Sequence, residues 1–355
     1  MRVMSRPLVI VAALLGLAIA IGPAAAEERF DGVTLRIATF GGPWREAMDK
    51  ELSPRFAKLG GKLEFVTGSP QANFAKLVAG RGRAAFDVIE ILDAQLPDYA
   101  QSNYLAAVDL AKIPNKQYLD SYQFNDKMIA IWSTEEGLCY NIDKFKALGL
   151  APPTTYKDLA QPVLAGRVMI PDINSGGGLA GFGGFVHAAG GDEVDIKPGL
   201  ALIKSIAGVK FWSQGDQVVI AFQAGDIYAA AAHAGWCQRA NSDRVKVASV
   251  HPVIKDGVVG VSKDGWLGIL STSPNIAAAH WFLNAYIDAD FQLAFAISTG
   301  VVPVNHVAMA KMGEDPVLAR MLELDPKAIA NELRIDYSKV NISDWNEQWN
   351  RMIAQ

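Results

Sequence analysis

The stretch KMIAIWSTEEGLCYNIDKF, Lys127–Phe145, lies where the pattern of the chain changes. Apolar residues dominate both of its halves, and the polar run Ser133–Glu136 separates them. Short apolar runs bounded by polar residues are typical of strands, so the stretch predicts two strands joined through Ser133–Glu136. We expect the chain to enter a second lobe near Glu135 and to return to the first lobe near Trp266.

Upstream of this stretch, strand-like and helix-like segments alternate. The predicted strands are Thr34–Phe40, Lys62–Gly68 and Phe86–Leu92, and the predicted helices are Trp44–Leu59 and Gln71–Gly80. Such alternation indicates an α/β protein with a parallel sheet and helices on both faces. Ligands of such sheets bind beyond the carboxyl ends of the strands, and Trp44 and Asp93 each follow a predicted strand end.

The first 26 residues have the three parts of a secretory signal peptide. Arg2 and Arg6 precede the apolar run Leu8–Ile21, and three alanines end the segment. The apolar run is shorter than the roughly 20 residues that span a bilayer. We expect cleavage after Ala26 and export of a soluble protein to the periplasm without membrane insertion, and a retained N-terminal anchor is the alternative.

The composition excludes several classes of function. Loss of Arg2 and Arg6 with the signal peptide changes the formal net charge from −4 to −6, and nucleic-acid binding requires clustered Lys and Arg instead. Five scattered histidines and two distant cysteines lack the spacing of a metal site. We expect no metal and no cofactor.

The two cysteines, Cys139 and Cys237, would both lie in an oxidising compartment. A pair of cysteines there can form one disulfide. The alternative is two separate buried thiols, because sequence alone gives no distance between them.

The order of several motifs resembles that of periplasmic solute-binding proteins of ABC importers, in particular the polyamine (spermidine/putrescine) type. The motifs are the run Ala130–Asn141 and the segments PPTTYKDL (152–159), LAGRVMIPD (164–172), AGDIYAAAAHAGWCQRA (224–240) and GWLGIL through VVPVN (265–305). The resemblance implies a type II periplasmic-binding fold, with two doubly wound α/β lobes joined by crossing strands. It implies lobes of residues 30–134 plus 266–303 and of residues 135–265 plus 304–355.

The resemblance also implies a monomer that holds a small ligand between its lobes and delivers it to an ABC permease. The ligand would be polyamine-like, amino-acid-like or a related organic ion, and hinge closure would enclose it. Trp44 and Trp266 would grip the ligand between two indole rings, because aromatic faces attract ammonium groups. For Trp44 the alternative is a structural role at the start of a helix, packed between the lobes.

Acidic and polar residues complete the predicted site. Glu135 and Glu136 are neighbours on a strand and must face opposite ways, so we expect only one of them to enter the cleft and pair with a cationic ligand group. The alternative is a solvated charge at the hinge. Asp172 and Asn174 lie where polyamine-binding relatives have acidic contacts. The run after them, Ser175 and three glycines, would expose backbone N–H groups to a carboxylate or phosphate. This segment serves a zwitterion better than a pure polycation, and a flexible turn is its alternative.

Other candidates follow from departures from the polyamine pattern. The relatives have an acid two residues after the tryptophan that corresponds to Trp266, where this chain has Gly268. Asp264 is the substitute that we expect for that acid. Trp236 and Arg239 stand where the relatives have a small polar or acidic turn, and Arg239 would face an anionic group or serve as a structural partner. Asp93 and Gln95 are candidates because they follow the third predicted strand.

A secreted α/β enzyme acting on a small polar metabolite is the alternative function. The sequence contains no Gly-x-Ser-x-Gly pentapeptide, no Walker A loop and no His-Glu-x-x-His. These motifs position the catalytic groups of hydrolases, nucleotide-dependent enzymes and metalloproteases. We therefore expect a binding protein rather than an enzyme.

Overall fold

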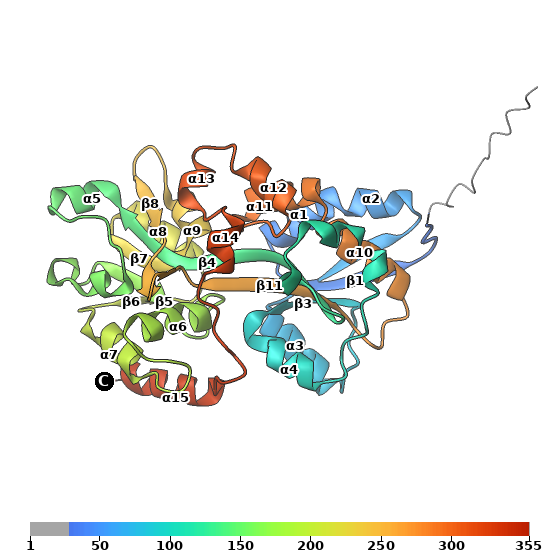
Figure 1. Cartoon of the computed structure of the whole chain (residues 1–355), viewed down its shortest axis with the longest axis horizontal. Coiled ribbons are helices and arrows are strands. Elements are labelled where there is room, and N and C mark those ends of the chain that lie inside the picture. Colours follow the sequence, from blue (N-terminus) through green and yellow to red (C-terminus); the bar gives the residue numbers. More distant parts are fainter. Residues whose placement is uncertain (1–27, 355) are drawn as a thin grey trace, which may run out of the picture.

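A single mixed sheet of nine strands runs through the protein. The computed structural model describes residues 28–354, so the predicted signal peptide, residues 1–26, lies outside the described residues. The strand order is β2-β1-β3-β11-β4-β7-β5-β6, with β8 paired to β4. Helices cover the faces of this sheet at both of its ends (Figure 1). The predicted α/β class is confirmed.

The first lobe is built on three parallel strands, β1 (Thr34–Thr39), β2 (Lys62–Thr67) and β3 (Val88–Leu92). β1 lies in the middle and pairs with both other strands. All five residues of β3 are buried, as a strand covered on both faces requires. These three strands match the predicted ones to within two residues at each end.

The predicted helix Trp44–Leu59 is two helices, α1 (Pro43–Glu51) and α2 (Ser53–Lys58). Pro54 lies in the first turn of α2. Proline has no backbone N–H and clashes with the preceding turn, so one continuous helix is not available here.

Two long strands connect the lobes, β4 (Met128–Asn141) and β11 (Ser262–Ile269) (Figure 1). β4 is one strand of 14 residues, so the prediction of two strands joined through Ser133–Glu136 is wrong. The polar residues continue the strand because β4 has strand partners along its whole length. It pairs with β11 up to Glu135 and with β7 from Glu136 onward, and this change of partner marks the passage between lobes.

The second lobe carries the remaining strands of the sheet. They are β5 (Val168–Pro171), β6 (Lys210–Trp212), β7 (Ala229–His233) and β8 (Val247–Val250). β5 pairs in parallel with β6 and β7, whereas β7 and β8 run antiparallel to β4. A separate hairpin of β9 (Val253–Lys255) and β10 (Val258–Val259) lies beside this lobe.

The other helices cover these strands. They are α3 (Pro70–Ala79), α4 (Leu96–Gln101), α5 (Ile142–Ala147), α6 (Gly178–Ala188), α7 (Lys197–Ser205), α8 (Asp216–Ala224), α9 (Ala234–Ala240), α10 (Ile276–Tyr286), α11 (Ala289–Thr299), α12 (His306–Met312), α13 (Leu318–Met321), α14 (Pro326–Ala330) and α15 (Ile342–Ile353). None of the helices within residues 28–354 is long and apolar enough to cross a membrane.

Each lobe has its own hydrophobic core, and the C-terminal residues divide between the two. Met309 and Met312 of α12 and Leu318 of α13 pack in the first core, together with β1, β3 and α11. Trp345 and Trp349 of α15 pack in the second core. The predicted boundary placed all of 304–355 in the second lobe, whereas the packing places α12 with the first lobe.

Cys139 of β4 and Cys237 of α9 form a disulfide, which confirms the predicted pairing. Their Cα atoms are 5.4 Å apart, and both residues are fully buried. The bond fastens α9 to the second-lobe half of the crossing strand.

Candidate functional site

A cavity of about 220 Å³ lies between the two lobes. The first lobe contributes the end of β3 and the starts of α3 and α4, and the second lobe contributes the turn before α6 and its first residues. Lys263 of β11, Tyr337 before α15, and Ile342 and Asn346 of α15 complete the wall. The polar lining residues are Gln71, Asp93, Gln95, Asp98, Asn174, Ser175, Lys263, Tyr337 and Asn346.

The second-lobe wall is the turn into α6. Asn174 N donates a 2.9 Å hydrogen bond to Asp172 Oδ1, and Ser175 N donates to the backbone carbonyl of Asp172. These bonds occupy Asp172, which does not line the cavity. Ser175 is 7% exposed, and its hydroxyl is buried without a hydrogen-bond partner among the described residues. The first N–H groups of a helix have no partner within it and carry partial positive charge, so this wall suits an anionic group.

Lys263 adds a positive charge to the cavity wall, and the buried carboxylate of Glu136 neutralises it. Its Nζ lies 2.6 Å from Glu136 Oε1 and 3.2 Å from the carbonyl oxygen of Gly176. Glu136 is 1% exposed and lies behind the wall. A Cβ on Gly177 would lie 2.6 Å from Glu136 Oε2, so only glycine lets the turn approach this carboxylate.

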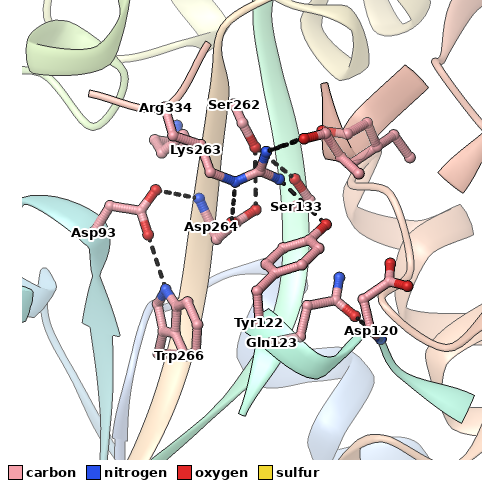
Figure 2. A network of polar contacts seen from close by, with 12 residues as sticks. Asp93, Asp120, Tyr122, Gln123, Ser133, Ser262, Lys263, Asp264, Trp266 and Arg334 are labelled. Carbon is pink, nitrogen blue, oxygen red and sulfur yellow. Dashed lines mark hydrogen bonds and ion pairs between the residues drawn. The ribbon is translucent and has the colours of Figure 1, made fainter. Parts of the chain in front are cut away.

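Asp93, directly after β3, provides the acidic wall of the cavity. It accepts hydrogen bonds from Asp264 N at 2.7 Å and from Trp266 Nε1 at 2.8 Å (Figure 2). Burial, reinforced by the nearby Asp264 carboxylate, raises the pKa of Asp93 to about 8. The group therefore holds a proton at neutral pH and can release it when a cation approaches.

Gln95 lines the same wall, but its side-chain amide is hydrogen-bonded to the backbone. Its Oε1 accepts from Leu92 N at 3.1 Å, and its Nε2 donates to the Pro70 carbonyl at 3.2 Å.

Within residues 28–354, no group of three His, Cys, Asp or Glu side chains is placed to hold a metal ion. The cavity thus offers an anion-binding wall opposite an acidic wall.

Residues 57–319 match the family model of bacterial extracellular solute-binding proteins, which covers well over half of the chain. The chain belongs to this family. The predicted resemblance is thereby confirmed. No curated protein matches the sequence at a significant level.

Solved structures of ABC transporter substrate-binding proteins share the fold of this solute-binding protein. The Atu4243–GABA receptor is 18% identical, with a TM-score of 0.74 over 90% of this chain and 97% of that chain. AgtB from Agrobacterium tumefaciens R10, in complex with agropinic acid, is 18% identical, with a TM-score of 0.69 over 92% and 100%. The spermidine/putrescine protein PotD from Streptococcus pneumoniae is 15% identical, with a TM-score of 0.72 over 91% and 98%. These relatives support the predicted two-lobe type II fold.

The two predicted indole rings do not face each other across the cavity of this solute-binding protein. Trp44 packs edge-on in the first lobe, with ring centroids 6.0 Å from Trp132 and 5.6 Å from Phe295 of α11. Trp266 is 7% exposed and donates to Asp93. Neither ring lines the cavity. Trp44 lies in the first turn of α1, and its side chain packs against Phe295 of α11. The ring that we expected at the rim of the cavity is therefore part of the packing of the first lobe.

Glu135 and Glu136 lie on opposite faces of β4, as the alternation of a strand requires. Glu136 lies behind the cavity wall, where it pairs with Lys263. Glu135 faces the other way and pairs with the imidazole of His251. Neither carboxylate lines the solute cavity directly.

Asp264, Trp236 and Arg239 also have structural partners instead of a place on the cavity wall. Asp264 Oδ2 lies 3.6 Å from Arg334 Nε, and Arg334 stacks on Tyr122 (Figure 2). The guanidinium of Arg239 lies 4.4 Å from the ring centroid of Trp236. It also donates to a backbone carbonyl at the end of α11, so it ties the two lobes together.

Lys263 and Tyr337 line the cavity but were not predicted. Lys263 lies one residue before the predicted Asp264, and the alternation of β11 turns the two side chains to different sides. Tyr337 reaches the cavity from the segment before α15. No local sequence signal marks it, because only the return of the C-terminal segment brings it there.

Proposed function

We propose that this solute-binding protein captures a small zwitterion, with one carboxylate and one ammonium group, in the cavity between its lobes. The observation that carries the proposal is the hydroxyl of Ser175. This hydroxyl is buried and unpartnered, and Ser175 lines the cavity just before α6. An unsatisfied buried hydroxyl is unfavourable unless a ligand provides its partner.

The ligand carboxylate would bind at the α6 wall. Ser175 would donate its hydroxyl hydrogen, and the first N–H groups of α6, at Leu179 and Ala180 on the same wall, would donate from the backbone. Lys263 would add attraction, although Glu136 already offsets most of its charge. This wall favours a carboxylate over the second ammonium of a polyamine.

The ligand ammonium would bind at the opposite wall, near Asp93 and Asp98. Position 268, where polyamine binders have an acid, does not supply a further carboxylate. A Cβ on Gly268 would lie 2.8 Å from Leu105 Cδ2, inside the apolar first lobe. With one acidic wall and one anion-binding wall, the cavity fits a zwitterion better than putrescine.

Ligand contacts with both lobes would shift the protein toward a closed form, because only that form makes all of them. We propose that the closed monomer then docks on an ABC permease from the periplasmic side. Two structural relatives are described with GABA and with agropinic acid, and a third with the name spermidine/putrescine.

Thermal unfolding of the mature protein with 4-aminobutyrate, putrescine or butyrate tests this proposal. We expect 4-aminobutyrate to raise the melting temperature more than putrescine or butyrate does, since its two charged groups contact both walls. Stabilisation grows with the ratio of ligand concentration to Kd. Stronger stabilisation by putrescine would contradict the proposal.

Ser175→Ala should weaken 4-aminobutyrate binding about tenfold by calorimetry, because it removes a buried donor to a carboxylate. Ser298→Ala, at an exposed serine on α11, is the matched control and should bind normally. Recovery of unchanged 4-aminobutyrate after long incubation separates binding from the alternative of an enzyme. Conversion of the compound would favour the enzyme.

A further inference from the structure

A second cavity, of about 150 Å³, lies on the side of β4 that Glu135 faces, away from the solute cavity. We refer to it as the rear cavity, and Glu135, His251, Glu323, Asn331 and Glu332 line it. The segments on either side of α14 and the β9–β10 hairpin form its walls. Nothing in the proposed solute-binding mechanism uses these residues.

Three carboxylates reach the rear cavity from different parts of the chain. Glu135 is 7% exposed and Glu332 is 8% exposed. Glu135 Oε1 and Glu332 Oε2 are buried without a hydrogen-bond partner among the described residues. Glu323 lies at the same cavity and is half-buried. Two unsatisfied buried carboxylate oxygens on one small cavity point to a missing donor.

The charges at the rear cavity do not balance. His251 pairs with the second oxygen of Glu135, and no lysine or arginine is among the described residues that line the cavity. Arg334, the cation that acts on Glu332 electrostatically, donates its hydrogen bonds to the backbone carbonyls of Ile329 and Ala330 and to the Tyr122 hydroxyl. Two of the three carboxylates therefore lack a cation of their own.

Backbone features indicate that this space is built to hold a carboxylate. Gly260 has φ +84°, and a Cβ there would lie 2.7 Å from Glu135 Oε1. Any larger residue would displace the Glu135 carboxylate from the rear cavity. Burial, together with Glu135 and Asp264, also raises the pKa of Glu332, as expected for a buried carboxyl group that has no hydrogen-bonded cation of its own.

We propose that the rear cavity binds a small primary alkylammonium ion. An ammonium group has three N–H donors and no acceptor, and ionised carboxylates are acceptors only. Charge-assisted bonds of this kind have heavy-atom distances near 2.8 Å, longer than the roughly 2.0–2.6 Å of Mg²⁺ or Ca²⁺ ligands. Among residues 28–354 no group of three His, Cys, Asp or Glu side chains is placed to hold a metal ion, which favours the organic cation, and the small volume limits it to a short alkyl chain.

Calorimetry with ethylammonium chloride at constant ionic strength tests the rear cavity. We expect one ethylammonium ion to bind each molecule of the mature protein. Tetramethylammonium has no N–H donor and should bind at least tenfold more weakly. Glu332→Gln keeps the shape of the side chain and removes one carboxylate, so ethylammonium should bind at least tenfold more weakly. Asp256→Asn, at an exposed acid in the adjacent hairpin turn, should leave binding unchanged.

Two comparisons separate this site from the solute cavity. Ethylammonium binding should persist in Asp93→Asn, and 4-aminobutyrate binding should persist in Glu332→Gln. Equal ethylammonium affinity in Glu332→Gln and the unmodified protein would overturn the proposal, as would equal affinity for tetramethylammonium. Loss of ethylammonium binding in Asp93→Asn alone would assign the ion to the solute cavity and also overturn it.

Discussion

Asp93 combines a structural and a binding role in one carboxylate. Its two oxygens accept from Asp264 N and from the indole of Trp266, which holds the group at the end of β3. The same carboxyl lines the solute cavity and has a pKa raised to about 8. A group that titrates near neutral pH makes ligand binding sensitive to pH.

We expect 4-aminobutyrate to bind more tightly as the pH rises from 7 to 9. Asp93 loses its proton over this range and gains the charge that attracts an ammonium, which itself stays protonated up to a pKa near 10. Calorimetry at both pH values measures the gain, and Asp93→Asn should remove most of it. Asp126→Asn, at an exposed acid, should keep the pH dependence. A pH-independent Kd in the unmodified protein would refute this role for Asp93.

Gly177 provides a second test on a single residue. An alanine Cβ there would lie 2.6 Å from the buried Glu136 carboxylate, which Lys263 holds in place. We expect Gly177→Ala to lower the free energy of unfolding by about 1–3 kcal/mol, the usual effect of overpacking, and to weaken solute binding. A Cβ on the adjacent Gly176 meets nothing within 4 Å, so Gly176→Ala is the control. Equal denaturant midpoints for the two variants would contradict this argument.

Among the elements, β4 has the greatest effect on the architecture. Its N-terminal half belongs to the first lobe and its C-terminal half to the second, and the change of partner falls between Glu135 and Glu136. One rigid strand therefore carries both the carboxylate behind the solute cavity and the carboxylate of the rear cavity. Their opposite faces follow from the two-residue period of a strand.

The disulfide between β4 and α9 should stabilise the second lobe. The two cysteines are separated by 98 residues, and a loop of that size corresponds to about 4–5 kcal/mol in the chain-entropy model. We expect the double variant Cys139→Ala, Cys237→Ala to unfold at a clearly lower urea concentration. Solute binding should persist at low temperature, because neither cysteine lines the solute cavity. An unchanged urea midpoint would show that the bond contributes little.

In the whole molecule, buried carboxyl groups gather along the two crossing strands and their neighbours. Burial raises the pKa values of Glu90, Asp93, Glu135 and Glu332, and Asp93 and Glu332 reach about 8 and about 9. Such groups bind protons more tightly in the folded protein than in the unfolded chain. The stability that they contribute is complete below their unfolded pKa values near 4 and is lost as the pH rises through the folded values.

We therefore expect the melting temperature to fall as the pH rises from 7 to 9. His251, whose pKa the Glu135 carboxylate raises, acts in the same direction. Buried His233 has a lowered pKa and acts in the opposite direction, but only below its unfolded value near 6.5. Thermal unfolding monitored by circular dichroism across this range measures the trend. A melting temperature that rises with pH would mean that these carboxyls are ionised in the folded state.

Local sequence was sufficient for the class of fold and the family, whereas the disulfide was only one of two alternatives until the structure placed the two cysteines together. Strand periodicity located β1, β2 and β3, because alternation of strands and helices depends on residues close together in the chain. The ordered motifs from Ala130 to Asn305 identified the family in the same way. The strand pattern also marked Asp93, since polar residues after buried strands collect at one edge of a parallel sheet. The resemblance to polyamine-binding proteins marked Asn174, and the glycine run before a helix marked Ser175.

Long-range packing determined which side chains reach the cavity. Trp44 and Arg239 carry the chemistry of a binding site, yet one packs against α11 and the other ties the lobes together. Lys263 comes to the cavity from the strand β11, and Tyr337 comes from the segment before α15. Both are more than 80 residues from Ser175 in the chain. Burial of an indole or the pairing of two charges depends on neighbours that only the folded chain brings together, and no window of sequence contains them.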